Sequence, residues 1–278
     1  LKNINYESKN VDLYKNDATN EVFGSLGLFS QINLEKLKDN FNHFLTPKIF
    51  VRYAPGSMRK EDDGDRLIAA DAFNMNRILN INNYETGASA TLGLDYNIRN
   101  KENISKLDFS LAQVINEKEN NKMSDISGLN EKLSDLVGNG GYNFNNNFKL
   151  NYSFALDQNY NDFNYHELGT TYNNGPLNIN FDYLRESKHI GDQDFFKTKI
   201  SLKNDEKGLL TFSNKRNLIT NSSEFYDLSY EYINDCLRAG LVYRREFYTD
   251  SESEPESSLM FQVTLIPFGD IEGPKFEY

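Results

Sequence analysis

Apolar and polar residues alternate with a period of two along most of the chain after Gly87. The clearest stretch is 148–156, in which Phe, Leu and Tyr residues alternate with Lys149, Asn151 and Ser153. Successive side chains of a β-strand point to opposite faces, so each such segment has one apolar and one polar face. No comparable helical stripe is present. The nearest candidate lies at 32–45, and its mixture of Leu37 with charged residues favours a polar turn.

This alternation predicts thirteen strands. They are expected near 20–33, 45–54, 83–98, 105–118, 134–144, 147–158, 163–173, 176–187, 194–203, 209–218, 223–233, 236–249 and 257–267. Most are about 10 residues or longer, which is the length that a tilted strand needs to cross a bilayer and exceeds the usual 5–6 of soluble sheets. The connections resemble hairpins, and Asn174-Gly175 is the strongest turn signal among them.

The lengths of the connections differ between the two ends of the expected sheet. If the strand at 257–267 ends in the periplasm, the outer side receives 250–256, 219–222, 188–193, 159–162, 119–133 and 55–82. The periplasmic side receives 234–235, 204–208, 174–175, 145–146, 99–104 and 34–44. The two longest connections fall outside and the tightest turns inside, as in outer-membrane barrels. The 34–44 turn is longer than this map predicts.

We therefore expect an all-β fold, an antiparallel transmembrane β-barrel of the outer-membrane type. A soluble β-sandwich or solenoid would also show alternation. Strand length, the content of 17 Tyr and 20 Phe, and the loop asymmetry favour the barrel. The lack of an internal repeat of 20–50 residues weakens the solenoid alternative.

Composition agrees with this expectation. The sequence has no run of 18 apolar residues that would predict a membrane-spanning helix. The mean hydropathy of −0.67 is compatible with strands that place every second residue in lipid. The net charge of −11 argues against nucleic-acid binding. No signal peptide follows Leu1, so we expect it either to have been cleaved or to lie upstream of this piece.

Three segments resemble LptD, the outer-membrane LPS-assembly family also called OstA. The first runs from Pro47-Lys48-Ile49-Phe50-Val51-Arg52-Tyr53-Ala54-Pro55 through Asp71-Ala72-Phe73-Asn74-Met75-Asn76-Arg77 to Tyr84-Glu85-Thr86-Gly87. The second, 230–247, is similar to the family's penultimate hairpin with a cysteine at its turn. The third, 255–265, is similar to the family's closing strand.

The resemblance implies that residues 1–278 form the C-terminal half of an LptD-like barrel, without the N-terminal jellyroll and the first barrel strands. A sheet of about 13 strands with open edges would expose unpaired backbone to lipid, so we expect either a fragment of a larger barrel or a closing partner elsewhere. The implied function is insertion of lipopolysaccharide into the outer leaflet through a lateral seam. The seam is expected at the last strand, at Leu259, Phe261, Val263, Leu265 and Pro267. Pro267 has no N–H for the strand ladder, although it could simply end the strand.

The resemblance also implies a role for the one cysteine and a set of partners. Cys236 would form a disulfide to the missing N-terminal region, because the family ties its barrel to the periplasmic domain there. A lone structural thiol is the alternative. The implied partners are lipopolysaccharide, an LptE-like lipoprotein plug, an LptA-like periplasmic bridge and the barrel-assembly machinery.

Charged residues also recur on the polar faces of two expected strands. They are Lys197, Lys199 and Lys203 on one strand and Arg238 and Arg244 on another. In a barrel these residues face the lumen. There they would pair with acidic neighbours, which is the favoured interpretation, or line a path for anionic sugars and phosphates.

No motif predicts an enzyme, a cofactor or a metal site. The three histidines, His43, His166 and His189, lack ligand spacing, and Gly138-Asn139-Gly140-Gly141 is interpreted as strand glycines and not as a phosphate loop. The acidic loop 61–65 lacks the later glutamate of a calcium loop. A porin or substrate-specific channel is the main alternative function, and an outer-membrane hydrolase using His166 or His189 is a third.

Overall fold

The computed structural model describes residues 1–10, 15–61, 66–78, 80–188, 191–204, 207–234, 236–247, 256–265 and 269–277, the last of these by backbone only. It contains two antiparallel sheets, and one single-turn 3₁₀ helix, η1 (Asp125–Ser127), is the helical element of the described residues. Among these residues, none lies in a helix with the length and hydropathy that a membrane crossing requires.

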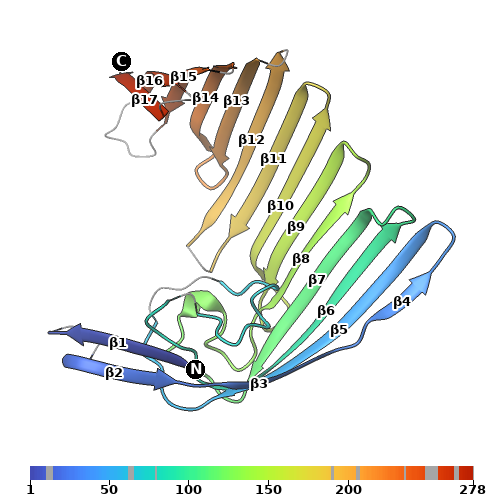
Figure 1. Ribbon diagram of the computed structural model, residues 1–278, viewed down its shortest axis with the longest axis vertical. Coiled ribbons are helices and arrows are strands. Elements are labelled where there is room, and N and C mark those ends of the chain that lie inside the picture. The colour runs from blue at the N-terminus through green and yellow to red at the C-terminus, as the bar shows by residue number, and fades with distance from the viewer. Residues whose placement is uncertain are drawn as a thin grey trace. The chain divides into compact units, whose positions relative to one another are not determined.

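A two-stranded sheet pairs β1 (Lys2–Ser8) with β2 (Asp17–Phe23). A 15-stranded sheet has the order β17-β16-β15-β14-β13-β12-β11-β10-β9-β8-β7-β6-β5-β3, with β4 also paired to β5 (Figure 1). Its strands are β3 (Leu26–Gln31), β4 (Leu34–Leu37), β5 (Phe41–Ala54), β6 (Gly87–Asn100), β7 (Ser105–Asn116), β8 (Leu136–Asn143), β9 (Phe148–Leu156), β10 (Phe163–Asn174), β11 (Leu177–Glu186), β12 (Gln193–Asn204), β13 (Gly208–Asn217), β14 (Ser222–Ile233), β15 (Leu237–Glu246), β16 (Glu256–Leu265) and β17 (Gly269–Glu277).

The all-β antiparallel class is confirmed, and so are the strands expected between 45 and 267, with small shifts at their ends. The polar turn expected at 34–44 is wrong. Residues 34–37 form β4, residues 41–54 form β5, and the turn between them is only 38–40. This correction removes the one connection that did not fit the map of short turns at one end of the strands.

Three further differences concern the two ends of the chain. The strand expected at 20–33 is divided at residues 24–25 into β2 of the small sheet and β3 of the large one. The strand β1 was not predicted. Neither was β17, which pairs with β16. The segment 257–267, expected to be the last strand, is therefore not at the edge of the sheet.

Pro47 explains why the strand beside β5 is interrupted. Gln31 pairs with Lys48 and Leu34 with Leu45, so the gap between β3 and β4 lies opposite Pro47. Proline has no N–H to donate to a neighbouring strand. One bond remains there, from Ile32 N to the carbonyl oxygen of Pro47 at 3.2 Å.

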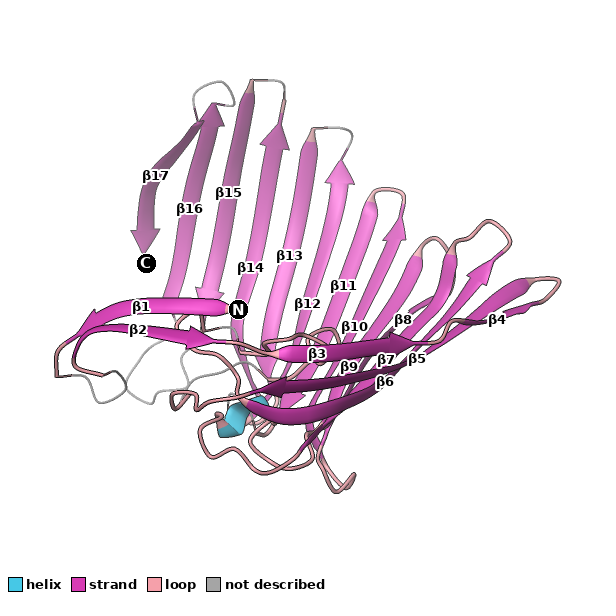
Figure 2. Cartoon of the chain, turned by 60° about the horizontal axis from the view of Figure 1, so that its bottom comes forward, coloured by secondary structure: helices cyan, strands magenta, loops and turns pink. Residues whose placement is uncertain are grey.

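The chain divides into two compact units. The first unit comprises Leu1–Tyr142, Tyr152–His166 and Glu186–Gly191, and the second comprises Asn143–Asn151, Glu167–Arg185 and Asp192–Tyr278. In the first unit, the long connections 55–86 and 117–135 gather at one end of the strands, together with η1 (Figure 2). We call the connection 55–86 the outer loop. Close contacts between the two connections include Leu67 N to Ser127 O at 3.0 Å and Glu61 N to Lys122 O at 2.8 Å.

Candidate functional site

The second unit has one continuous apolar face. Successive strands pair in register from β12 to β16, so side chains of equal parity line up across them. One cross-strand row contains Ile200, Phe212, Leu228, Tyr243 and Leu259, and the next contains Leu202, Leu210, Tyr230, Leu241 and Phe261. These ten side chains are each 37–51% exposed.

Exposed apolar rows of this extent are rare on proteins in water, and they mark contact with lipid or with another protein. No second sheet covers them among the described residues, because all strands of this unit belong to one sheet. The arrangement therefore differs from a sandwich, in which such rows would be buried between two layers.

The first unit repeats this pattern at its own strands. Leu28 of β3, Val51 of β5, Ala90 of β6 and Ile115 of β7 form one cross-strand row. The side chains of Leu28, Val51 and Ile115 are exposed. Each unit thus has an apolar face that is open to its surroundings.

The opposite face of the second unit carries charged and hydroxyl side chains. Ser213, Asp227, Arg244 and Ser258 form a cross-strand row on it. Arg244 donates hydrogen bonds to both carboxylate oxygens of Asp227, from Nε to Oδ1 at 2.7 Å and from Nη2 to Oδ2 at 2.8 Å. A two-pronged pair of this kind is the strongest form of guanidinium–carboxylate contact.

The three lysines of β12 and Arg238 of β15, which the sequence analysis singled out, lie on this polar face as well. Lys197, Lys199 and Lys203 are exposed on β12, opposite Lys215, Ser213 and Leu209 respectively. Arg238 of β15 contacts Glu231 at 3.7 Å, a longer and more exposed pair than that of Arg244. No ion pair of Lys199 or Lys203 occurs within the described part of the chain.

In the first unit, the outer loop covers the polar face of the sheet. Phe73 lies against Gly93 of β6, and a Cβ added to Gly93 would stand 2.5 Å from the Phe73 ring and 2.6 Å from the Leu111 carbonyl oxygen. Gly27 of β3 makes room in the same way, since its Cβ would stand 2.6 Å from the sulfur of Met75. The absence of a side chain at Gly93 and Gly27 therefore leaves room for Phe73 and Met75 of the loop. A larger residue at either glycine would displace the loop side chain that packs there.

A buried ion triad fixes the end of the outer loop that leads into β6. The Glu85 carboxylate accepts from Arg77 Nε at 2.8 and 3.1 Å and from Arg77 Nη2, and it forms an ion pair with Arg52 Nη1 at 3.0 Å. Arg52 Nη2 donates to the backbone carbonyl oxygen of Glu85 at 2.6 Å. The exposed fractions of the Arg52, Arg77 and Glu85 side chains are 1%, 0% and 6%. Arg77 Nη2 also donates to Ser89 Oγ at 3.0 Å, which ties the loop to β6.

The charge balance of the triad controls the protonation of its carboxylate. Burial alone would raise the pKa of Glu85, but the charge and hydrogen bonds of Arg77 and the charge of Arg52 hold that pKa below its usual value. Glu85 is therefore ionised at neutral pH and compensates two buried arginines.

The part of the outer loop around Arg66 reaches residues of β10 and β11. The Arg66 guanidinium lies 3.5 Å from the ring centroid of Tyr165, and its Nη1 contacts Glu186 Oε2 at 3.4 Å. Both Tyr165 and Glu186 are buried. The loop thus links β5 and β6 with strands that lie further along the sheet.

The hairpin of β1 and β2 packs near the two ends of the outer loop. Ile4, Phe23, Ala54 and Tyr84 form a small apolar core, and the Phe23 and Tyr84 rings stack with centroids 6.0 Å apart. Arg59 of the loop forms an ion pair with Glu21 of β2. The hairpin therefore holds the outer loop close to β5 and close to β6.

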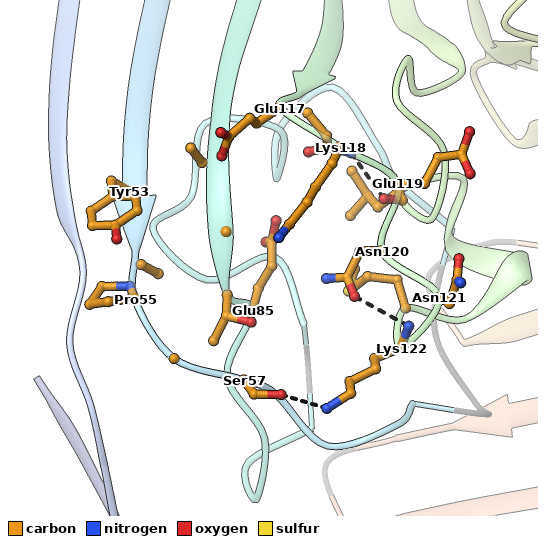
Figure 3. A pocket seen from close by; sticks show the side chains of 18 residues that line it. Tyr53, Pro55, Ser57, Glu85, Glu117, Lys118, Glu119, Asn120, Asn121 and Lys122 are labelled. Atoms are coloured by element: carbon orange, nitrogen blue, oxygen red, sulfur yellow. Dashed lines mark hydrogen bonds between the residues drawn. The ribbon is translucent and has the colours of Figure 1, made fainter.

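A pocket of about 440 Å³ lies where the outer loop and the connection 117–135 meet (Figure 3). Its lining is mainly polar, and Lys118 extends into it while Lys122 Nζ donates to Ser57 Oγ at 2.5 Å. Glu85 also lines it, but that carboxylate is already occupied by two arginines.

The remaining residues singled out in the sequence lie apart from one another. Cys236 is exposed just before β15, and its backbone N donates to Asn234 Oδ1 at 3.0 Å. Leu259, Phe261, Val263 and Leu265 belong to β16, which has β15 on one side and β17 on the other. Pro267 lies outside the described residues.

Three smaller sequence interpretations can also be compared with the structure. Gly138–Gly141 lie inside β8, and a Cβ on Gly138 would stand 2.6 Å from the Phe154 ring, which confirms them as strand glycines at a close approach. His43 Nδ1 bonds Tyr96 Oη at 2.8 Å, His166 stacks on Phe163, and His189 lies outside the described residues. Of the acidic loop, Glu61 accepts from Asn83 at 2.6 Å, and 62–65 are not described.

The triad and the Arg66 contact were not recognised as a site from the sequence. Arg52 and Arg77 do fall inside the first segment that resembles the family, and Arg52 interrupts the apolar run of β5. The sequence does contain one indication of the triad. An arginine stands alone inside a strand, and a second arginine and a glutamate follow in the next connection. The pairing itself depends on how a long loop folds, which strand periodicity does not encode.

Comparison with known proteins identifies the family. Residues 3–204 match the model of the family described as LptD, LPS transport system D. The match includes the outer loop and the triad, whereas the two C-terminal segments that resemble the family lie beyond it. No curated protein sequence matches the chain.

Solved structures with a similar fold are distant. A variant of the Rhodopseudomonas blastica porin shares 8% identity, covers 92% of this chain and 100% of its own, and has a TM-score of 0.39. OccAB4 of Acinetobacter baumannii shares 12% identity, covers 93% and 84% of the two chains, and has a TM-score of 0.31. The family match and the antiparallel sheet together point to a β-barrel component of lipopolysaccharide transport in the bacterial outer membrane. The chain belongs to the LptD family.

Proposed function

We propose that this chain forms part of an outer-membrane barrel that inserts lipopolysaccharide into the outer leaflet through a lateral seam. The observation that carries the proposal is the two-faced sheet: exposed apolar rows on one face and ion pairs, hydroxyls and lysines on the other. Lipopolysaccharide has the same division, since its acyl chains need lipid while its sugars and phosphates need a polar route. Family membership favours this function over a diffusion channel or a hydrolase.

The polar face of the second unit suits the head of such a substrate. Lys197, Lys199 and Lys203 are exposed cations, and Ser201, Thr211 and Ser229 form a hydroxyl row on the same face. Cations attract phosphates, and hydroxyls exchange hydrogen bonds with sugars. In the proposed barrel this face lines the lumen.

The seam is proposed at an edge of the sheet. β17 is the edge strand beside β16, so its backbone, and not that of residues 257–265, would form one side of the opening. Pro274 lies in β17, and a proline on an edge strand lacks a donor and weakens pairing with another strand. The open edges also support the proposal that the chain is the C-terminal half of a larger barrel, because unpaired backbone is not stable in lipid.

The remaining assignments rest on the family resemblance. Cys236 is proposed to form a disulfide with the N-terminal periplasmic region, to which its exposed position before β15 leaves it accessible. The proposed partners are an LptE-like lipoprotein in the lumen, an LptA-like bridge and the barrel-assembly machinery.

Depletion of the protein in its own bacterium tests the proposal. We expect newly made lipopolysaccharide to stay out of reach of surface-acting probes while other barrel proteins still assemble, and re-expression should restore its exposure. Normal surface lipopolysaccharide after complete depletion would refute the function. Loss of small-solute uptake alone would instead favour a channel.

A further inference from the structure

Two of the ion contacts that hold the outer loop, one at the end that leads into β6 and one at Arg66 inside the loop, differ strongly in quality. At the end next to β6, both carboxylate oxygens of Glu85 accept from guanidinium groups, and the backbone N of Arg77 donates to Glu85 Oε2 at 3.3 Å. Each arginine there leaves one buried nitrogen without a partner, Arg52 Nε and Arg77 Nη1. The carboxylate itself is fully engaged.

The ion contact at Arg66 is much weaker. Glu186 has a side chain only 1% exposed, yet its Oε1 has no hydrogen-bond partner, and within the described residues its Oε2 contacts Arg66 Nη1 at 3.4 Å. Arg66 also stacks on the Tyr165 ring, but its Nε is buried without a partner. Leaving a buried polar atom unpaired is unfavourable, so the loop is held at Arg66 at a cost that the triad avoids for its carboxylate.

Arg66 nevertheless remains reachable from outside. Its side chain is 23% exposed, in contrast to the buried Glu186. A guanidinium that presents a fork of donors binds phosphate through two parallel hydrogen bonds, which are stronger than one long contact. A phosphate group arriving at Arg66 would therefore compete well with Glu186.

We propose that Arg66 is a releasable clasp, which exchanges Glu186 for a phosphate group of the arriving substrate and so frees the outer loop around Arg66. The triad keeps the end that leads into β6 in place, so the loop lifts from β10 and β11 without leaving β5 and β6. The inference rests on the proposed function, since it takes the phosphorylated head of lipopolysaccharide as the releasing ligand.

Three backbone amides report release of the clasp. Leu67 N donates to Ser127 O, and Asp71 N and Ala72 N both donate to Ile68 O at 3.1–3.2 Å. The amide of Arg77, which donates to Glu85, reports the triad. Hydrogen exchange of the purified protein in its complete form separates the two regions.

The experiment compares three probes: phosphorylated lipopolysaccharide, the same lipid after chemical removal of its phosphates, and inorganic phosphate. We expect the phosphorylated lipid to speed exchange at Leu67, Asp71 and Ala72 by about fivefold or more, the factor that corresponds to one unpaired buried polar atom at the lower end of its range. Exchange at Arg77 should stay unchanged. An equal effect of inorganic phosphate would mean that the clasp recognises the anion alone, and it would overturn the lipid as the specific ligand.

Two variants keep the inference falsifiable. Arg66→Ala should show fast exchange at the three amides without any lipid and no further response to it, whereas the control Lys118→Ala should behave like the unsubstituted protein, because Lys118 is an exposed lysine in the neighbouring connection. No response of the unsubstituted protein to phosphorylated lipid, or joint opening of Arg77 with the three amides, would refute the clasp. If the clasp is refuted in this way but depletion of the protein still keeps new lipopolysaccharide from the cell surface, the proposed function stands without the clasp.

Discussion

Replacement of Glu85 by glutamine tests whether the buried triad holds the outer loop. Glutamine has almost the same shape but no charge, so Arg52 and Arg77 would stay buried without a counter-ion. Removal of one partner from a buried ion pair destabilises proteins by roughly 3–5 kcal/mol. Two arginines depend on this one carboxylate, so we expect a loss in the upper part of that range.

The loss should be local to the first unit. Exchange of the Arg77 amide and of the amides around it should rise by about three orders of magnitude, because the expected loss of ~4–5 kcal/mol is about three times the ~1.4 kcal/mol that corresponds to a factor of ten. Protection in β13–β15, which belong to the second unit, should stay the same. The assay is hydrogen exchange by mass spectrometry on the purified protein, together with a urea unfolding curve.

Two further variants show whether the loss comes from the unbalanced buried charges and not from the removal of any carboxylate in this region. Glu117→Gln removes an exposed carboxylate from the neighbouring connection and should change stability by less than about 0.5 kcal/mol. The triple change Arg52→Met, Arg77→Met and Glu85→Leu removes all three charges and should recover most of the loss, because apolar groups of similar size often replace buried ion triads without penalty. A Glu85→Gln variant as stable as the unsubstituted protein would refute the reasoning.

Three other predictions follow from the same structure. Gly93→Val should displace Phe73 from its place on β6 and cost about 1–3 kcal/mol, measured as increased exchange in the outer loop, and an unchanged loop would contradict the packing of Phe73 on Gly93. Leu228→Lys on the apolar face should impair membrane insertion by about 2–4 kcal/mol, while Ser229→Lys on the polar face should not; folding into lipid vesicles of both variants compares them, and equal yields would contradict the two faces. The pKa of Glu85 is lowered in the folded protein, so its stabilisation should be complete above the ordinary glutamate value of about 4.3 and disappear as the pH falls through the folded pKa; a loop whose protection is lost already near pH 6 would contradict it.

Periodicity predicted the strands well because the two faces of each strand differ strongly in polarity. It failed where that contrast is absent. Residues 34–37 read Leu-Glu-Lys-Leu, too short for the alternation to be recognised, and they form β4. β17 contains Gly269, Gly273 and Pro274, which normally indicate turns, and an edge strand tolerates them.

The outer loop shows what sequence patterns could not supply. Its length and its place after β5 were predicted, but its docking on the polar face was not. Docking depends on contacts between distant residues, such as Phe73 with Gly93 and Arg52 with Glu85. The polar side of each strand could be assigned by counting alone, because parity along a strand is a local property, and the register of β12 to β15 brings the lysines of β12 and the arginines of β15 onto one face.

The central claim is that the apolar rows contact acyl chains while the opposite face is wet. Its most direct test uses single spin labels at successive positions of β14, from Tyr226 to Tyr230, in a Cys236→Ser background and in the native membrane. Oxygen, which concentrates in lipid, and a water-soluble nickel chelate then compete as relaxation agents. We predict that oxygen dominates at Tyr226, Leu228 and Tyr230 and the chelate at Asp227 and Ser229, and equal access of the chelate at all five positions would contradict the account.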